Sequence, residues 1–147
     1  MIDLKKIHLI GIGGAGMSGI AEILINLGYI VSGSDLAKTP ITERLVSLGA
    51  KISFKHGSKN VLNKDLIVVS SAILKKNPEV IEAKRLKIPI IKRAEMLANL
   101  MMLKESVAIA GSHGKTTITC ILAHIFIFNK LDPSYIIGGK VECFASN

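Results

Sequence analysis

The sequence predicts an α/β fold with a mostly parallel, doubly wound sheet. Short apolar segments alternate with amphipathic ones over the first hundred residues, as expected for strands joined by right-handed helical crossovers. A fully apolar run at 65–73 is typical of a central parallel strand. The glycines of Gly11-x-Gly13-x-x-Gly16 stand between the first strand-like and the first helix-like segment. Together these observations predict a Rossmann-like domain.

Local signals place each element in order along the chain. The helix at 17–27 carries apolar residues at the i, i+3, i+4, i+7 spacing, and Gly28 ends it. The helix at 39–50 begins with Thr39 as a cap and Pro40 in its first turn, and Gly49 ends it. Asn77 with Pro78 starts the next helix. The other expected helices cover 77–87, 93–104 and 116–129, and the expected strands cover 6–11, 29–35, 51–54, 65–73, 88–91 and 106–111.

Composition excludes several classes of function. The 147 residues carry a net charge of +8, but most lysines are scattered singly and aromatic residues make up only 4%, which does not suit a nucleic-acid surface. The most apolar stretch, 118–128, is too short to span a bilayer. Cys120 and Cys143 have no metal-ligand spacing, and we expect Cys120 to be buried as a small hydrophobe. We therefore expect a cytoplasmic protein without nucleic-acid or membrane partners.

The first glycine cluster predicts a diphosphate site. Gly11 permits a tight turn, Gly13 lets backbone N–H groups approach a pyrophosphate, and Gly16 allows close packing of the helix on the strand. The helix N-terminus adds positive partial charge. Asp35 ends the second strand, where an acid accepts from a ribose or base. The predicted ligand-binding residues are Gly11, Ile12, Gly13, Gly14, Ala15, Gly16 and Asp35. NAD and a UDP-sugar both fit this pattern.

A second loop, AGSHGKTT at 110–117, predicts a nucleoside triphosphate site. It is a variant P-loop, because Ile109 stands where the strict pattern has glycine. Lys115 would neutralise the transferred phosphoryl group and Thr116 would hold Mg²⁺, so these two are the predicted catalytic residues. We expect His113 to shape the loop rather than act as a base. The predicted ATP-binding residues are Gly111, Ser112, His113, Gly114, Lys115, Thr116 and Thr117.

Two phosphate sites in series indicate two anionic substrates, one of them ATP. An NAD enzyme needs no γ-phosphate site beside its dinucleotide fold. The pair of motifs therefore favours phosphoryl transfer to a nucleotide-linked substrate. A binding module for a UDP-sugar or nucleotide, without catalysis, and a fragment of an NAD-binding oxidoreductase are the alternatives.

The two motifs together resemble the Mur ligase family of peptidoglycan synthesis, and within it the alanine-adding branch. The resemblance is carried by HLIGIGGAGMSGIAEIL (8–24), SGSD (32–35), VVSSAI (68–73), NPE (77–79), IPIIKRAEMLANLM (88–101), AGSHGKTT (110–117) and LDPSYIIGGK (131–140). It implies that Gly11 to Gly16 receive the diphosphate of UDP-N-acetylmuramate, with Asp35 toward the uridine. It also places Ser70 and Ser71 at the ligand-binding edge of the sheet.

The family reaction implied by this resemblance forms an amide. The muramoyl carboxylate takes the γ-phosphoryl group of ATP, and the amine of L-alanine then displaces phosphate from the acyl phosphate. Two positions differ from the family pattern: Ser112 replaces the usual Thr, and the final VECFASN (141–147) drifts from it. His113 is typical of the alanine-adding branch, whereas other members usually carry Asn.

Family members are much longer than this chain, so the resemblance divides it into two parts. Residues 1–104 correspond to the domain that binds the UDP-substrate, and 105–147 to the first strand, P-loop and helix of the ATP-binding domain. We expect the chain alone to bind its UDP-substrate weakly and to catalyse little. We expect it to be a truncated gene product, a fragment, or a split subunit whose other domains lie on another chain. Because 118–128 is apolar nearly all round, we expect 105–147 to be poorly ordered or to lie on the first domain.

Overall fold

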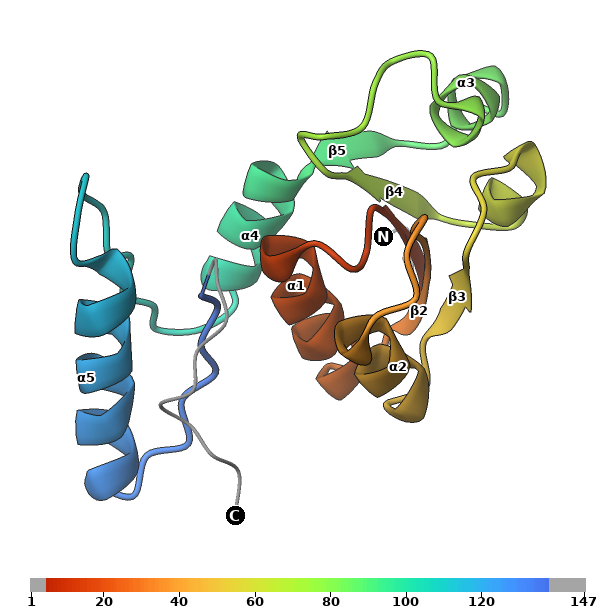
Figure 1. Cartoon of the computed structure of the whole chain (residues 1–147). Coiled ribbons are helices and arrows are strands. Elements are labelled where there is room, and N and C mark those ends of the chain that lie inside the picture. The colour runs from red at the N-terminus through yellow and green to blue at the C-terminus, as the bar shows by residue number, and fades with distance from the viewer. Residues whose placement is uncertain (1–4, 138–147) are drawn as a thin grey trace.

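The computed structural model describes residues 5–137, and its centre is a five-stranded parallel sheet with the order β3-β2-β1-β4-β5 (Figure 1). This confirms the predicted doubly wound sheet. As in a Rossmann-like fold, the chain adds strands outward from β1 in one direction, to β2 and β3, and then in the other, to β4 and β5, so the strand order reverses between β1 and β4. The strands are β1 (Lys6–Ile10), β2 (Ile30–Ser34), β3 (Lys51–Ser53), β4 (Leu66–Val69) and β5 (Ile90–Lys92).

Helices cover both faces of this sheet. They are α1 (Ala15–Asn26), α2 (Pro40–Ser47), α3 (Pro78–Arg85) and α4 (Arg93–Met101), with a short 3₁₀ helix η1 (Ser58–Val61) that the sequence did not predict. A further helix, α5 (Lys115–Phe128), follows α4 in the chain and does not cover the sheet (Figure 1). Helices α1, α2 and α4 share one core cluster with Ile7 and Leu9 of β1. Helix α3 and η1 enclose a smaller cluster with Ile10 on the opposite face. Successive side chains of β1 point to opposite faces of the sheet, so this strand contributes to both core clusters.

The predicted caps are present. Thr39 and Thr42 form a reciprocal capping box at the start of α2, and the Asn77 side chain accepts a hydrogen bond from the backbone of Glu79 at the start of α3. Gly28 and Gly49 follow α1 and α2 with φ of +85° and +106°, values that favour glycine. These signals fix where the helices begin and end.

Two predicted strands differ from the structure. The run at 106–111 forms no strand, because a strand needs a hydrogen-bonded partner and the part of the chain that the structure describes places none beside it. The run at 65–73 ends as a strand at Val69, and Ser70 begins a turn closed by a bond from Ile73 N to its carbonyl. Ser70 and Ser71 thus follow the strand instead of belonging to it.

Helix α5 stands apart from the sheet, beyond α4 (Figure 1). Its apolar side chains are largely uncovered, with Ile121 55% and Phe128 88% exposed, and Cys120 is half-buried rather than fully buried. Ile136 packs on the core that α1, α2 and α4 form with the sheet, beside Gly19 of α1. Residues 105–147 were expected to be poorly ordered or to lie on the preceding part of the chain, and Ile136 makes such a contact. Residues 138–147, with Cys143, lie outside the described residues.

Within residues 5–137, none of the helices combines the length and the apolar character that crossing a bilayer requires.

Candidate nucleotide-binding site

The glycine loop lies at the switch point of the sheet, between the carboxyl ends of β1 and β4. In open α/β sheets this crevice is where ligands bind. Gly11 has φ of +79°, and a Cβ added to it would lie 3.1 Å from the Cβ of Ser70. Ser70 donates its N–H to the carbonyl of Ile10 at 3.2 Å. The structure therefore brings Ser70 beside the loop as predicted, and Ser71 lies exposed in the following turn.

Four of the six N–H groups of the glycine loop, residues 11–16, already donate within the protein. The bonds run from Gly11 N and Ile12 N to Ser34 O (2.8 and 3.1 Å), from Gly13 N to Asp35 Oδ2 (2.8 Å) and from Gly14 N to Gly11 O (3.2 Å). Among the described residues, the N–H groups of Ala15 and Gly16 have no acceptor. The loop's own donors toward an anion are therefore these two, at the start of α1.

Asp35 fastens the glycine loop to the end of β2. Besides its bond from Gly13, its other oxygen accepts from the N–H groups of Leu36 and Ala37 at 2.8 and 3.2 Å. A Cβ on Gly13 would lie 2.9 Å from the Asp35 carboxylate, so this contact requires glycine. The carboxylate predicted to face a ribose thus also has a structural task.

Two loop residues have surroundings that the spacing did not indicate. The side chain of Ile12 is fully buried and packs against Gly33, where a Cβ would lie 2.6 Å from it. Gly16 leaves room for the side chain of Arg93, because a Cβ there would lie 2.6 Å from Nη1. The glycine at position 16 therefore accommodates an arginine, whereas the sequence predicted packing of helix on strand.

Sequence reasoning missed a buried polar cluster beneath this edge of the sheet. The carboxylate of Glu79, in the first turn of α3, is fully buried. Its Oε2 accepts from Ser34 Oγ at 2.6 Å and lies 3.0 Å from His56 Nδ1, and its Oε1 accepts from Asn60 Nδ2 at 2.5 Å. His8 Nε2 lies 3.6 Å from Oε1. One signal in the sequence was available, since polar residues within central strands require buried partners.

The cluster keeps Glu79 ionised. Burial alone would raise the pKa of this carboxyl, but the neighbouring His8 imidazole and the hydrogen bonds from Ser34 and Asn60 outweigh it and lower the pKa to about 2. Because the carbonyl of Ser34 also holds Gly11 and Ile12, the cluster lies directly behind the glycine loop.

The second predicted loop is exposed and precedes α5. Gly114 has φ of +75° and is the N-cap of the helix. The ammonium of Lys115 donates to the carbonyl of Gly111 and, at 3.2 Å, to that of Ser112. His113 Nδ1 lies 3.2 Å from the Ser112 hydroxyl, which fits the expectation that His113 shapes the loop. Thr116 and Thr117 are exposed at the first turn.

Metal-ligating side chains are sparse around this loop. Within residues 5–137 there is no group of three His, Cys, Asp or Glu side chains placed to hold a metal ion. A Mg²⁺ ion at Thr116 would therefore draw its remaining ligands from phosphate, water or residues beyond those described.

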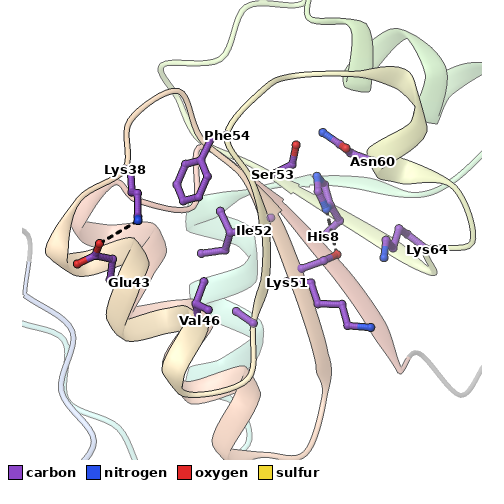
Figure 2. Close-up of a pocket in the computed structure, with 13 residues that line it drawn as sticks. His8, Lys38, Glu43, Val46, Lys51, Ile52, Ser53, Phe54, Asn60 and Lys64 are labelled. Atoms are coloured by element: carbon purple, nitrogen blue, oxygen red, sulfur yellow. Dashed lines mark hydrogen bonds and ion pairs between the residues drawn. The ribbon is translucent and has the colours of Figure 1, made fainter.

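A cavity of about 750 Å³ flanks the edge strand β3 (Figure 2). Lys51 and Ser53 line it from one face of β3, Ile52 lines it from the other, and His8 and Asn60 reach it from the polar cluster. None of the predicted site residues belongs to its lining. The cavity is thus separate from the switch point.

The sheet order and the glycine loop at the switch point define an α/β protein of the Rossmann-like class, with a second glycine-lysine loop further along the chain. Residues 6–105 match the family model described as "Mur ligase family, catalytic domain". The chain belongs to the Mur ligase family.

Curated relatives are similar over almost the whole of this chain. It is 60% identical over 142 residues to the UDP-N-acetylmuramate–L-alanine ligase of Anaeromyxobacter dehalogenans. The aligned region covers 97% of this chain and 31% of that protein. It is 55% identical over 144 residues to the enzyme of the same name from Geobacter sulfurreducens, with 98% and 31% covered. The chain thus spans about a third of the length of these relatives.

Solved structures show the same arrangement. The UDP-N-acetylmuramate-alanine ligase of Thermotoga maritima superposes with a TM-score of 0.87 at 34% identity, over 93% of this chain and 32% of that one. A UDP-N-acetylmuramate:L-alanyl-gamma-D-glutamyl-meso-diaminopimelate ligase from Neisseria meningitides gives a TM-score of 0.84 at 32% identity, over 97% and 45%.

Proposed function

We propose that this chain is the UDP-N-acetylmuramate-binding part, and the beginning of the ATP-binding part, of a ligase that adds L-alanine in peptidoglycan precursor synthesis. The observation that carries the proposal is the 60% identity to a UDP-N-acetylmuramate–L-alanine ligase over 97% of the chain. The glycine loop at the switch point supports it, because the loop offers open N–H groups at a helix N-terminus to a diphosphate.

The proposed reaction has two steps. The carboxylate of UDP-N-acetylmuramate attacks the γ-phosphorus of ATP, which forms an acyl phosphate and releases ADP. The amine of L-alanine then attacks the acyl carbon, the C–O bond to phosphate breaks, and an amide, phosphate and a proton result. Mg²⁺ would neutralise phosphate charge while bound.

The chain's own residues have separate tasks in this proposal. Gly11 to Gly16 orient the diphosphate, and Ser70, Ser71 and Asp35 border it. Residues Gly111 to Thr117 bind ATP, with Lys115 leaving the carbonyls of its loop to contact phosphate oxygens and Thr116 donating a ligand to Mg²⁺. Two parts follow from this assignment, a UDP-substrate domain at 1–104 and the start of an ATP-binding domain at 105–147.

We propose that this chain alone binds the UDP-substrate without turning it over. Helix α5 and its loop are exposed, so they form no closed site that would exclude water from an acyl phosphate. The split-subunit arrangement, with other ligase domains on a separate chain, would supply the missing walls.

Calorimetric titration of the 147-residue chain with UDP-N-acetylmuramate, NAD and ATP tests the proposal. We expect heat of binding with UDP-N-acetylmuramate and none with NAD. Binding of NAD with no response to the UDP-sugar would instead identify an oxidoreductase fragment. Release of phosphate on mixing the chain with ATP, UDP-N-acetylmuramate and L-alanine would show that it is active alone.

A further inference from the structure

Arg93 lies against the first turn of α1, at the open end of the glycine loop. We propose that its guanidinium binds a phosphate group of the nucleoside diphosphate there, which makes it a binding residue of that site. This inference rests on the proposed function of the loop and adds a residue that neither glycine spacing nor P-loop pattern indicated.

The fold brings Arg93 to the loop. It is the first residue of α4 and directly follows β5, so it emerges at the carboxyl edge of the sheet, as the glycine loop does. Its side chain then lies along Gly16, where an added Cβ would be 2.6 Å from Nη1, 3.3 Å from Cζ and 3.4 Å from Cδ. The guanidinium thus lies at the same helix turn as the open N–H groups of Ala15 and Gly16.

Within residues 5–137, Arg93 has no ion-pair partner, unlike the other two arginines of the chain. Arg44 pairs with Glu22 at 3.1 Å, and Arg85 pairs with Glu82 at 2.7 Å, although both arginines are about two-thirds exposed. Arg93 is half-buried, yet among the described residues no carboxylate lies within ion-pair distance of it. The arginine with the least access to water is therefore the unpaired one.

Asp35 is the carboxylate bonded to this loop, and its oxygens already accept from the N–H groups of Gly13, Leu36 and Ala37. The N-terminus of α1 carries positive partial charge, and its first turn holds no acidic residue. A half-buried guanidinium beside it adds a full positive charge, which is unfavourable unless an anion lies between them. A phosphate oxygen there would accept from Ala15 N, Gly16 N and the guanidinium together.

The donor count of the loop explains why an arginine is needed. Residues 11–14 have already used their N–H groups, so two donors remain for two phosphate groups. The planar guanidinium supplies further donors in a fork that matches a phosphate. A single N–H pair at a helix end binds such an anion less tightly than this combination.

Titration calorimetry with uridine 5′-diphosphate and with uridine tests the inference. In the 147-residue chain, Arg93→Gln is expected to weaken binding of the diphosphate at least about tenfold and to leave uridine binding unchanged, because uridine has no phosphate. Arg85→Gln, which removes a paired surface arginine, should change neither. Arg93→Lys, which keeps the charge without the fork, should fall between the wild type and Arg93→Gln.

The two parts of the argument fail in distinguishable ways. If the wild-type chain binds no diphosphate, the proposed function fails and the inference with it. If the wild-type chain binds it and Arg93→Gln binds equally well, only the inference is overturned. An equal loss of diphosphate and uridine binding in both Arg93 variants would also overturn it, because Arg93 would then act through the fold.

Discussion

At the scale of single residues, Glu79 connects more of the molecule than any residue that the sequence singled out. Its carboxylate meets side chains from β1, β2, η1 and the segment after β3. A buried carboxylate is costly unless several donors compensate it, and here they do. The charge of Glu79 therefore contributes to stability in a way that depends on pH.

The Glu79→Gln variant tests this pH dependence. The folded pKa of about 2 lies below the usual 4.5, so the ionised group stabilises the fold above about pH 4.5 and loses that effect as the pH falls toward 2. The wild type should lose on the order of 3 kcal/mol of unfolding free energy over this range through Glu79. Urea titrations from pH 6 to pH 2 should show this component of the acid loss in the wild type and not in Glu79→Gln.

Glu82→Gln is the matched control for that experiment. Glu82 lies in the same helix but pairs only with the exposed Arg85. Its variant should follow the wild-type pH profile closely. A Glu79→Gln profile that falls as steeply as the wild type between pH 4.5 and pH 2 would contradict the role of the cluster.

Gly33 offers a second test at this scale. A Cβ at this position would lie 2.6 Å from Ile12 Cδ1 and 2.8 Å from the carbonyl oxygen of Leu9, which belongs to the backbone. We expect Gly33→Ala to cost roughly 1–3 kcal/mol of unfolding free energy through overpacking. Gly57→Ala, at a position with nothing within 4 Å, should be neutral or slightly stabilising in the same denaturant titration. Equal stability of both variants would refute this account of position 33.

At the scale of elements, the strongest sequence signals were those with local causes. Thr39 with Pro40 and the glycines after α1 and α2 identified helix ends that the structure confirms. The prediction of a strand at 106–111 was wrong, because an apolar sequence indicates only a preference for burial, whereas a strand also requires a neighbouring strand with which to form hydrogen bonds. The polar cluster escaped prediction because its members come from separate segments and meet only once the sheet has formed.

The capping box of α2 gives a prediction for an element. The Thr39 hydroxyl accepts from Thr42 N at 3.3 Å, and the Thr42 hydroxyl accepts from Thr39 N at 2.9 Å. Thr39→Ala should therefore lower the unfolding free energy by about 1 kcal/mol, whereas Thr39→Ser should restore most of it. Thermal or urea unfolding measures both, and an unchanged midpoint in Thr39→Ala would show that the cap is dispensable.

At the scale of the whole molecule, some features of the glycine-loop site could be predicted from sequence patterns, whereas others depend on tertiary packing. Glycine spacing predicted the loop at 11–16 between the first strand and the first helix, and the structure adds that this loop lies at the switch point of the sheet. It did not reveal that most loop N–H groups are already used, that Ile12 is buried or that Arg93 fills the space at Gly16. Those facts depend on neighbours far apart in the sequence. The ligand assignments of Asp35, Ser70 and Ser71 stay predictions.

The exposed face of α5 leads to a prediction for the whole chain. Ile121 and Ile125 are 55% and 49% exposed, so they contribute little to the stability of the fold. Ile121→Glu should change the unfolding free energy by less than about 0.5 kcal/mol and should reduce binding of a hydrophobic dye. Ile20→Ala, at a fully buried position of α1, should instead cost roughly 2–5 kcal/mol. A large loss of stability in Ile121→Glu would mean that α5 is packed in solution.

The contact of Ile136 with Gly19 has a consequence for where the second loop can go. Helix α4 and Ile136 both pack on the same core, so the segment between them, which contains the loop at 110–117 and α5, is anchored at both of its ends. A segment anchored in this way keeps the loop at 110–117 at an effective concentration on the order of millimolar near the core on which its ends pack. A phosphate donor gripped by Lys115 would therefore encounter a ligand on the glycine loop far more often than one free in solution.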